Sequence, residues 1–542
     1  MKKTSRFVVF VLSLLMSYSA FAGSFSFESL PVQEAGRVKP MVTVAQESLQ
    51  LVHGKSTFEK KKALDIVTTW MLVPEPWMEK SLLKIDHHGL KEALGFDKTR
   101  KYFSVKEVGT HPRLNIFFSD LAGRVERKEK LKPYYQAVQR MQSQLLTFHG
   151  IQQGGLKIFP PQEGSENTSW TPLRDADPEV KELFFKMMGA YTSMFVSGPG
   201  DAQEKSKIEL QKFVGEFTEK AKSVGGKLYP DASDMAIEVH YQKFKPFLWT
   251  WILYLLAALL FALSYLVATK VLRQLGLSVT VAAFLIHTYG FVLRCIITGR
   301  PPVSNMYETV VWVGWGTILF AGIFALVKKN TLMFLVGSVV AALCMLVADF
   351  APVILDGSLQ PLEPVLRSNL WLTIHVMTIT LSYAAFFLAF GIGDYGIFLY
   401  IRDQKKFKAK IRELSLDCYR LIQVGVVLLA AGTILGGVWA DYSWGRFWGW
   451  DPKETWAFIA LMGYLAMLHA RLVGWLREFG MLAGSIASFS LVIMAWYGVN
   501  FVLGAGLHSY GFGAGGIQYV SGFVVLHLIY VGYAWLIKSR GA

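Results

Sequence analysis

A tryptophan-rich segment between two long apolar runs carries residue types suited to binding a flat ligand. Five of the chain's 16 tryptophans lie in the eighteen residues 439–456. An aromatic belt at a bilayer surface uses about one or two aromatic residues per helix end, whereas here glycines between the tryptophans let the backbone approach a ligand closely. Its cations suit a ligand with anionic edges. The residues expected to form this surface are Trp444, Arg446, Trp448, Trp450, Asp451, Lys453 and Trp456.

Five histidines accompany the apolar second half of the chain: His287, His375, His469, His508 and His527. An ionisable side chain in or beside a membrane span is a functional hypothesis by default, because its burial is costly. A hydrogen-bonded packing role is an equally good interpretation for any single one. The expected depth of each histidine in the membrane helps to distinguish the two interpretations. This depth follows from the positions of the predicted spans.

The composition predicts a membrane protein. The 542 residues are 53% hydrophobic and 18% charged, with a mean hydropathy of +0.35, which excludes an ordinary soluble or disordered chain. The net charge of +15 is expected from basic cytoplasmic loops, so no nucleic-acid partner is predicted. The three cysteines form no CxxC or CxxCH motif, which excludes a thioredoxin-like motif and a covalent c-type heme on this chain.

The candidate residues lie in or between long apolar runs. Each run has close to the roughly 20 residues that a helix needs to cross the bilayer. Basic residues gather in alternate gaps between them, so those gaps are cytoplasmic and the tryptophan segment is external. The fold class is therefore an all-α polytopic membrane protein. Its nine predicted spans are 246–269, 278–299, 308–327, 331–349, 371–400, 419–439, 455–473, 480–503 and 517–537.

The first 245 residues are predicted to lead into the membrane from outside. Lys2, Lys3 and Arg6, the apolar run 7–16 and a small-residue site at 20–22 predict a signal peptide over 1–22, or an uncleaved anchor. Residues 23–245 are polar, and apolar positions within 179–195 and 202–224 recur at helical spacing, which predicts two amphipathic helices. We expect a mainly helical extracytoplasmic domain there, followed by the multi-span domain 246–542.

The predicted spans bring two histidines to the depth of the tryptophan segment. His375 lies at the outer end of the fifth span, and His508 lies just beyond the outer end of the eighth. Two neutral imidazoles form a standard axial pair for heme iron. His469 lies deeper, toward the cytoplasmic end of the seventh span, with His287 at comparable depth and His527 near mid-span.

The tryptophan segment, with Trp448-Gly-Trp-Asp-Pro at its centre, resembles the WWD signature of heme-handling proteins, and His375 and His508 complete the pattern. Three further stretches resemble the CcsA (ResC) branch of that family, the system II for cytochrome c maturation. They are residues 299–308, 368–375 and 498–511. The resemblance, to a CcsBA-like cytochrome c synthase, covers about residues 278 to 537.

This resemblance implies a heme route across the membrane and an external site of heme ligation. His375 and His508 would hold the iron of heme b over the tryptophan surface, and His469 would help to hold heme within the membrane. The synthase would then join the heme vinyl groups to the two cysteines of a CxxCH motif in apocytochrome c. The implied location is the bacterial inner (plasma) membrane, with a thiol-reducing pathway supplying reduced client cysteines.

The chain departs from the fused synthases because no multi-span ResB-type portion precedes the exported domain. We expect a separate ResB/CcsB-like membrane partner to supply a second intramembrane heme ligand, with His287 as the less favoured source. Residues 31–40 and 238–247 resemble the extracytoplasmic end of such fusions weakly.

Three other functions stay open at this point. One is a system I heme delivery or lyase subunit of the CcmC or CcmF type. Another is an electron-transfer subunit in which His375/His508 and His287/His469 hold two permanent hemes b. A solute transporter has thin support in Asp349, Asp394 and His527.

Two groups of polar residues near the external face have both structural and functional interpretations. Arg300, Asn305 and Glu308 fit either a brace for the site, with a possible propionate contact, or the cap of the third span. Asp451, Pro452 and Glu454 fit an N-terminal cap for the seventh span within a functional segment.

Overall fold

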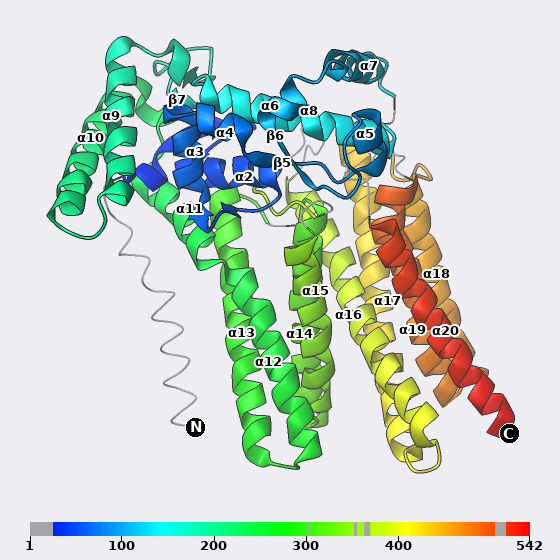
Figure 1. Cartoon of the computed structure of the whole chain (residues 1–542). Coiled ribbons are helices and arrows are strands. Elements are labelled where there is room, and N and C mark those ends of the chain that lie inside the picture. The colour runs from blue at the N-terminus through cyan, green and yellow to red at the C-terminus, as the bar shows by residue number, and fades with distance from the viewer. Residues whose placement is uncertain are drawn as a thin grey trace. The chain divides into compact units, whose positions relative to one another are not determined.

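The computed structural model describes residues 25–129, 131–301, 303–351, 355–361, 369–503 and 516–541 (Figure 1). Contacts divide the described chain into two compact units that meet in sequence at Phe244 and Lys245. The signal segment expected over 1–22 and the candidate ligand His508 lie outside the described residues. Each unit is described by itself.

The first unit is mainly helical with short antiparallel strands, which the sequence pattern did not predict. Its amphipathic segments form α9 and α10, as predicted. Its helices are α2 (Met41–His53), α3 (Ala63–Leu72), α4 (Glu75–Glu79), α5 (His88–Ala93), α6 (Val105–Gly109), α7 (Leu114–Glu126), α8 (Pro133–Gln152), α9 (Pro178–Val196), α10 (Asp201–Gly225) and α11 (Ala232–Phe244). Single 3₁₀ turns cover Phe27–Ser29, Leu173–Asp175 and Gly226–Leu228.

The strands form one four-stranded sheet of order β2-β1-β7-β8 and two hairpins, β3-β4 and β5-β6. They are β1 (Pro31–Glu34), β2 (Arg37–Pro40), β3 (Thr57–Phe58), β4 (Lys61–Lys62), β5 (Ser81–Lys84), β6 (Tyr102–Ser104), β7 (Lys157–Phe159) and β8 (Thr171–Pro172). Arg37 on β2 makes a bidentate ion pair with the buried Glu238 on α11, with both N–O distances 2.7 Å. This pair fixes the end of the unit to its sheet, because a bidentate guanidinium pair is directional.

The second unit is a helical bundle. Among the described residues, nine helices are long and apolar enough to cross a membrane, which confirms the predicted polytopic fold. The helices are α12 (Pro246–Leu266), α13 (Lys270–Thr298), α14 (Met306–Lys328), α15 (Leu332–Phe350), α16 (Asn369–Asp403), α17 (Lys408–Trp444), α18 (Pro452–Leu472), α19 (Glu478–Ile493) and α20 (Ile517–Gly541). α19 continues as a π-helical segment, Met494–Leu503.

Several helices are longer than the predicted spans, among them α13, α16 and α17. α16 has 35 residues and α17 has 37, because both continue through charged positions where the apolar run stops. Hydropathy locates only the part of a helix that lies in hydrocarbon, and a charged extension can remain helical in water.

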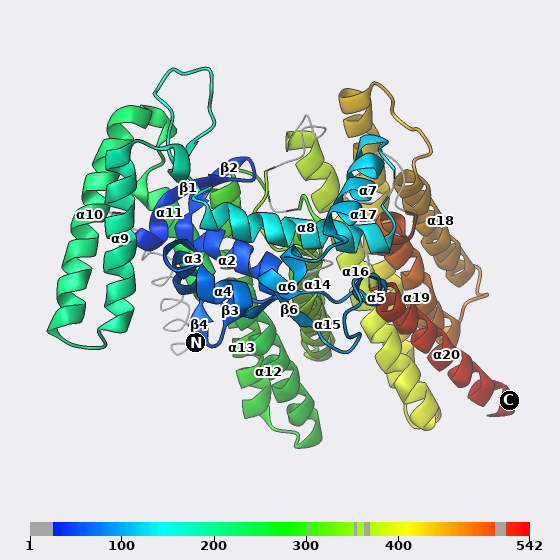
Figure 2. The same cartoon turned by 45° about the horizontal axis from the view of Figure 1, so that its top comes forward.

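The bundle has two groups of helices joined through α14. α12 packs on α13 and α15, α14 packs on α15 and α16, and α16 packs along α17 and α19. α18 contacts α17 and α19, while α20 contacts α19 and α16. Figures 1 and 2 show α14 and α15 between the α12–α13 pair and the helices α16 to α20.

Candidate functional site

A cavity opens where the predicted external ends of five helical segments meet. It holds about 1080 Å³ of empty space, part of it open to solvent. Its wall comes from the start of α14, the first half of α16, the end of α17, the start of α18 and the π-helical segment after α19. Aromatic and aliphatic groups dominate the wall, and a few polar groups converge in it, as is usual for small-molecule sites.

His375 enters this cavity from α16 in a fixed orientation. Its Nδ1–H donates to the carbonyl of Gly432 at 2.7 Å, and its ring stacks near Trp439 with an interplanar angle of 11°. A carbonyl only accepts, so the proton lies on Nδ1 and the lone pair lies on Nε2. That tautomer is the one in which imidazole ligates a metal through Nε2.

Glycines of α17 make room for this arrangement. A Cβ at Gly436 would lie 2.5 Å from Cε1 of His375, and a Cβ at Gly437 would lie 2.5 Å from the Phe447 ring. Gly432 and Gly436 form a GxxxG spacing that lets two helices approach closely in a membrane. Sequence reasoning missed these glycines, although this spacing was the signal that could have found them.

Helix α16 is also held from the other side. The indole N–H of Trp312 on α14 donates to the carbonyl of Met377 at 3.2 Å. Thr380 and Tyr383 line the cavity on the helical face that carries His375. Both were missed by sequence reasoning, and their helical spacing from His375 was the signal.

The tryptophan segment, residues 439–456, runs from the end of α17 into the start of α18. The turn uses Gly445 at φ 71°, and Trp450 at φ 56° precedes the Asp451-Pro452 start of α18. Asp451 accepts a hydrogen bond from the Lys453 backbone N–H at 3.0 Å. The predicted N-terminal cap of this helix is therefore confirmed.

Glu454 organises the same segment. Its carboxylate accepts the backbone N–H groups of Gly449 at 2.8 Å and Asp451 at 3.1 Å, and it pairs with Arg446 at 3.4 Å. The guanidinium of Arg446 also lies over the Trp444 ring, 5.6 Å from its centroid. Arg446 thus holds the segment together as well as being a candidate for ligand contact.

Only some of the residues predicted to bind the ligand line the cavity. His375, Trp448 and Lys453 do so, together with Trp439, Phe447 and Glu454. The other candidates shape the segment around it, and Trp450 is 68% exposed. Those that do not line the cavity are Trp444, Arg446, Trp450, Asp451 and Trp456.

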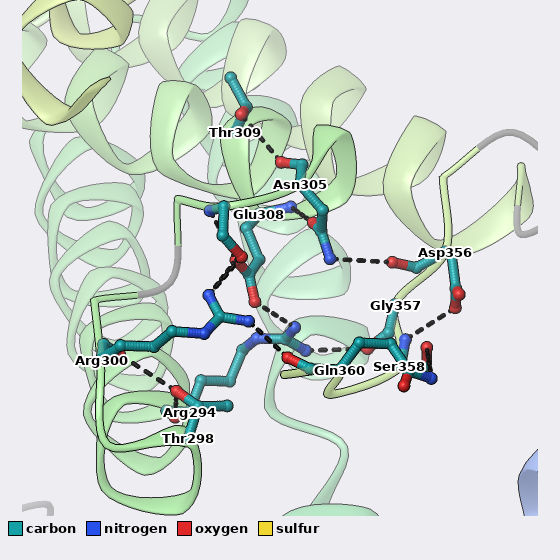
Figure 3. A network of polar contacts seen from close by, with 11 residues as sticks. Arg294, Thr298, Arg300, Asn305, Glu308, Thr309, Asp356, Gly357, Ser358 and Gln360 are labelled. Carbon is teal, nitrogen blue, oxygen red and sulfur yellow. Dashed lines mark hydrogen bonds and ion pairs between the residues drawn. The ribbon is translucent and has the colours of Figure 1, made fainter. Parts of the chain in front are cut away.

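The start of α14 forms the opposite part of the wall. Asn305 caps this helix by accepting the Glu308 backbone N–H at 2.8 Å, as predicted. Glu308 in turn binds Ser304 through its backbone N–H and its hydroxyl, both at 2.9 Å. Ser304, Asn305 and Met306 line the cavity. Figure 3 shows Asn305 and Glu308 in a network of polar contacts with Arg300, and their role as a brace stays a prediction.

The other histidines that the structure describes in the second unit lie apart from the cavity wall. His469 is exposed on α18, and its Nδ1–H donates to the carbonyl of Leu465 at 2.7 Å. It follows the cavity residue Ala457 by twelve positions, about 18 Å along the helix. His527 on α20 lies 3.3 Å from Asp394 and donates from Nδ1 to Phe523.

His287 is a packing residue in this structure. It is fully buried, with Nε2 3.1 Å from the carbonyl of Val311 and Nδ1 3.3 Å from the hydroxyl of Tyr254. Nε2–H donates to the carbonyl and Nδ1 accepts from the hydroxyl, so both ring nitrogens are engaged. This arrangement leaves neither nitrogen available to a metal.

The fold and cavity define a class of polytopic helical membrane protein with a cavity lined in part by tryptophans. Residues 303–508 match the family described as cytochrome C assembly protein. The CcsA cytochrome c biogenesis protein of Guillardia theta is 34% identical over 263 residues, which cover 44% of this chain and 85% of that protein. The chain therefore belongs to the CcsA family of cytochrome c biogenesis proteins.

Two other proteins are similar to this chain. Protein NrfI of Wolinella succinogenes is 29% identical over 517 residues, covering 90% of this chain but only 55% of NrfI. A solved structure of the cytochrome c heme lyase CcmF is 16% identical, with a TM-score of 0.37, and covers 54% of this chain and 50% of that one. A score of that size supports no detailed comparison.

Proposed function

We propose that the chain holds heme b in the external cavity and presents it for covalent attachment to the CxxCH motif of an apocytochrome c. The carrying observation is His375, which lines the cavity and whose Nδ1–H donates to Gly432, so that the Nε2 lone pair is oriented for iron. The cavity suits heme as a substrate because aromatic rings line it and Lys453 offers a cation for a propionate. His508 is the proposed second axial ligand.

The proposed reaction needs little covalent chemistry from the protein. A client thiol adds across a heme vinyl group, so that sulfur bonds to one carbon and the thiol hydrogen ends on the other. The chain would orient heme and hold its iron by two imidazoles, one of which the client histidine displaces. This makes the chain the synthase subunit of the reaction.

The inner part of the proposed route involves His469. This imidazole is exposed on a predicted span, and its Nδ1–H donates to Leu465, so its Nε2 carries a lone pair that suits iron. A ResB-like partner would supply the opposite ligand, since His287 is engaged through both nitrogens. The match covers only 55% of NrfI. The rest of NrfI is long enough to contain such an additional portion.

The proposed location is the bacterial inner membrane, with residues 23–245 and the tryptophan segment outside. The di-heme electron-transfer alternative loses support, because it needs His287 as an iron ligand. The system I alternative loses support because the family assignment rests on CcsA proteins.

The proposal is tested by cytochrome c maturation in a bacterial host that lacks its own system and expresses a CxxCH client together with the suspected partner. His375→Ala or His508→Ala should abolish covalent heme staining of the client, and added imidazole should partly restore it by replacing the lost ligand. His88→Ala, which removes an exposed histidine of the first unit, is the matched control. Full maturation by His375→Ala without imidazole would refute the assignment.

A further inference from the structure

The connection between α16 and α17 carries a dense group of exposed basic side chains. Six basic and two acidic residues occupy positions 402–413, which leaves a formal excess of four positive charges. Figures 1 and 2 show this connection projecting beyond the ends of α14 and α15. Its exposed basic residues, named here the cationic tip, are Arg402, Lys405, Lys406, Lys408 and Arg412.

The carboxylates near the cationic tip are mostly paired with other groups. Glu413 pairs with Lys410 at 2.9 Å. Asp417 is fully buried and pairs with Lys328 at 2.7 Å. The third carboxylate, Asp403, accepts a backbone N–H within the connection at 2.9 Å. One exposed carboxylate therefore faces the five cations of the tip.

Residues outside the described ranges do not change this charge balance. Their only acidic residue is Glu363, which precedes the opposite end of α16 in the sequence. Arg402 follows the first residue of α16, Asn369, by 33 positions, about 50 Å along the helix. Charges at the two ends of α16 are therefore screened from each other, because the screening length is about 8 Å at physiological salt.

The contact between Lys328 and Asp417 gives the depth of the cationic tip. Lys328 follows the predicted third span, 308–327, so Asp417 lies at the predicted cytoplasmic end of that span. Arg412 precedes Asp417 by five positions and Lys408 precedes it by nine, about 7.5 Å and about 14 Å along the helix. The lipid headgroups occupy about 5–7 Å on each side of the hydrocarbon. The long basic side chains can therefore reach the lipid phosphates.

We propose that the cationic tip binds the phosphate headgroups of anionic phospholipids in the cytoplasmic leaflet. Clusters of about 4–8 lysines and arginines immediately cytoplasmic of a span attract anionic lipid. Three of the five side chains are lysines, whose compact charge on a flexible stem suits headgroups that vary in position. The proposal goes beyond the charge bias that sets orientation, because it assigns a preference among lipids. It does not require heme, so it stands apart from the proposed function.

The test is native mass spectrometry of the purified full-length protein in detergent, titrated with phosphatidylglycerol or with zwitterionic phosphatidylcholine. The wild type should bind phosphatidylglycerol more tightly, and higher salt should weaken this binding. Lys405→Gln/Lys406→Gln/Lys408→Gln should lower the phosphatidylglycerol affinity about tenfold or more, because each lysine beside an anionic surface contributes about fivefold. Lys405→Arg/Lys406→Arg/Lys408→Arg keeps the charge and should bind like the wild type.

The matched control is Lys60→Gln/Lys61→Gln/Lys62→Gln, which removes the same charge from exposed positions of the first unit. Its phosphatidylglycerol affinity should stay close to that of the wild type. If the tip variant fails to fold, the single variant Lys405→Gln decides, with an expected loss of about fivefold.

Three results would overturn the inference. Equal losses in the two glutamine triples would mean that lipid binding follows net charge alone. Equal affinity of the wild type for the two lipids would mean that it has no preference for an anionic headgroup. A tip variant that keeps its phosphatidylglycerol affinity but loses binding of added hemin would assign the tip to heme instead of lipid.

Discussion

The imidazole of His375 has one nitrogen bonded to the Gly432 carbonyl and one face toward Trp439. These two contacts select the tautomer and the direction of Nε2. Such second contacts commonly set the position of a metal-binding histidine and raise its basicity as a ligand. The residue type could be read from the sequence, whereas its orientation depends on contacts with another helix.

Gly436 offers a residue-scale test of that orientation. In Gly436→Ala the new methyl group would overlap the His375 ring, so the ring must move and the bond to Gly432 is lost. Because such a bond contributes about 1 kcal/mol, we expect heme affinity to fall about fivefold, measured by absorbance titration of the purified protein. Gly522→Ala on α20 is the control, since a Cβ there meets nothing within 4 Å. Unchanged affinity in Gly436→Ala would contradict the assigned orientation.

At this scale the residues that carry chemistry could be predicted from the sequence. The residues whose small side chains leave room for the His375 ring could not. His375, Trp448 and Lys453 stood out by residue type and spacing, and all three line one cavity. Gly436 and Arg294 did not, because their roles depend on which helix faces which. A single sequence gives helix periodicity but not the partner face.

The helices are fixed to one another by a few directional contacts at both ends. On the predicted external side, the bonds of Arg294 and Arg300 to Gly357 and Gln360 hold the α15–α16 connection against α13 and the α13–α14 connection. On the opposite side, Lys328 at the end of α14 pairs with the fully buried Asp417 of α17 at 2.7 Å. Charge spacing along the sequence predicted the caps of α14 and α18 because caps are local, but these cross-helix pairs are not local.

The Lys328–Asp417 pair gives an element-scale prediction. Lys328→Met leaves a buried carboxylate uncompensated, which costs about 3–5 kcal/mol, so the thermal unfolding temperature in detergent should fall clearly. The double variant Lys328→Met/Asp417→Leu removes both charges and should recover much of the loss. The control is Lys329→Met, the adjacent lysine. A double variant no more stable than Lys328→Met would contradict the pairing.

At the scale of the whole molecule, hydropathy and charge bias predicted the polytopic helical fold, and the described helices confirm it. The prediction worked because each span must satisfy its own backbone hydrogen bonds in lipid, which leaves a strong sequence signal. The short strands of the first unit were not predicted. Segments of two to four residues are too short to show an alternation of apolar and polar residues.

The predicted orientation can be tested by cysteine labelling in a chain whose three native cysteines are replaced by serine. Tyr442→Cys, at a position 67% exposed within the tryptophan segment, should react with a membrane-impermeant maleimide in spheroplasts. Lys405→Cys, in the exposed α16–α17 connection, should react only after the membrane is permeabilised. The reverse pattern would put the cavity on the cytoplasmic side and exclude an external client.

The central claim, that the cavity binds heme through His375, is tested most directly by the absorption spectrum of the purified protein. The wild type should be compared with His375→Ala and His508→Ala, oxidised and reduced, with and without the suspected partner and added imidazole. We predict a low-spin spectrum of bis-histidine heme that weakens in both variants and recovers with imidazole. Heme that survives both substitutions unchanged would put its ligands elsewhere and contradict the account.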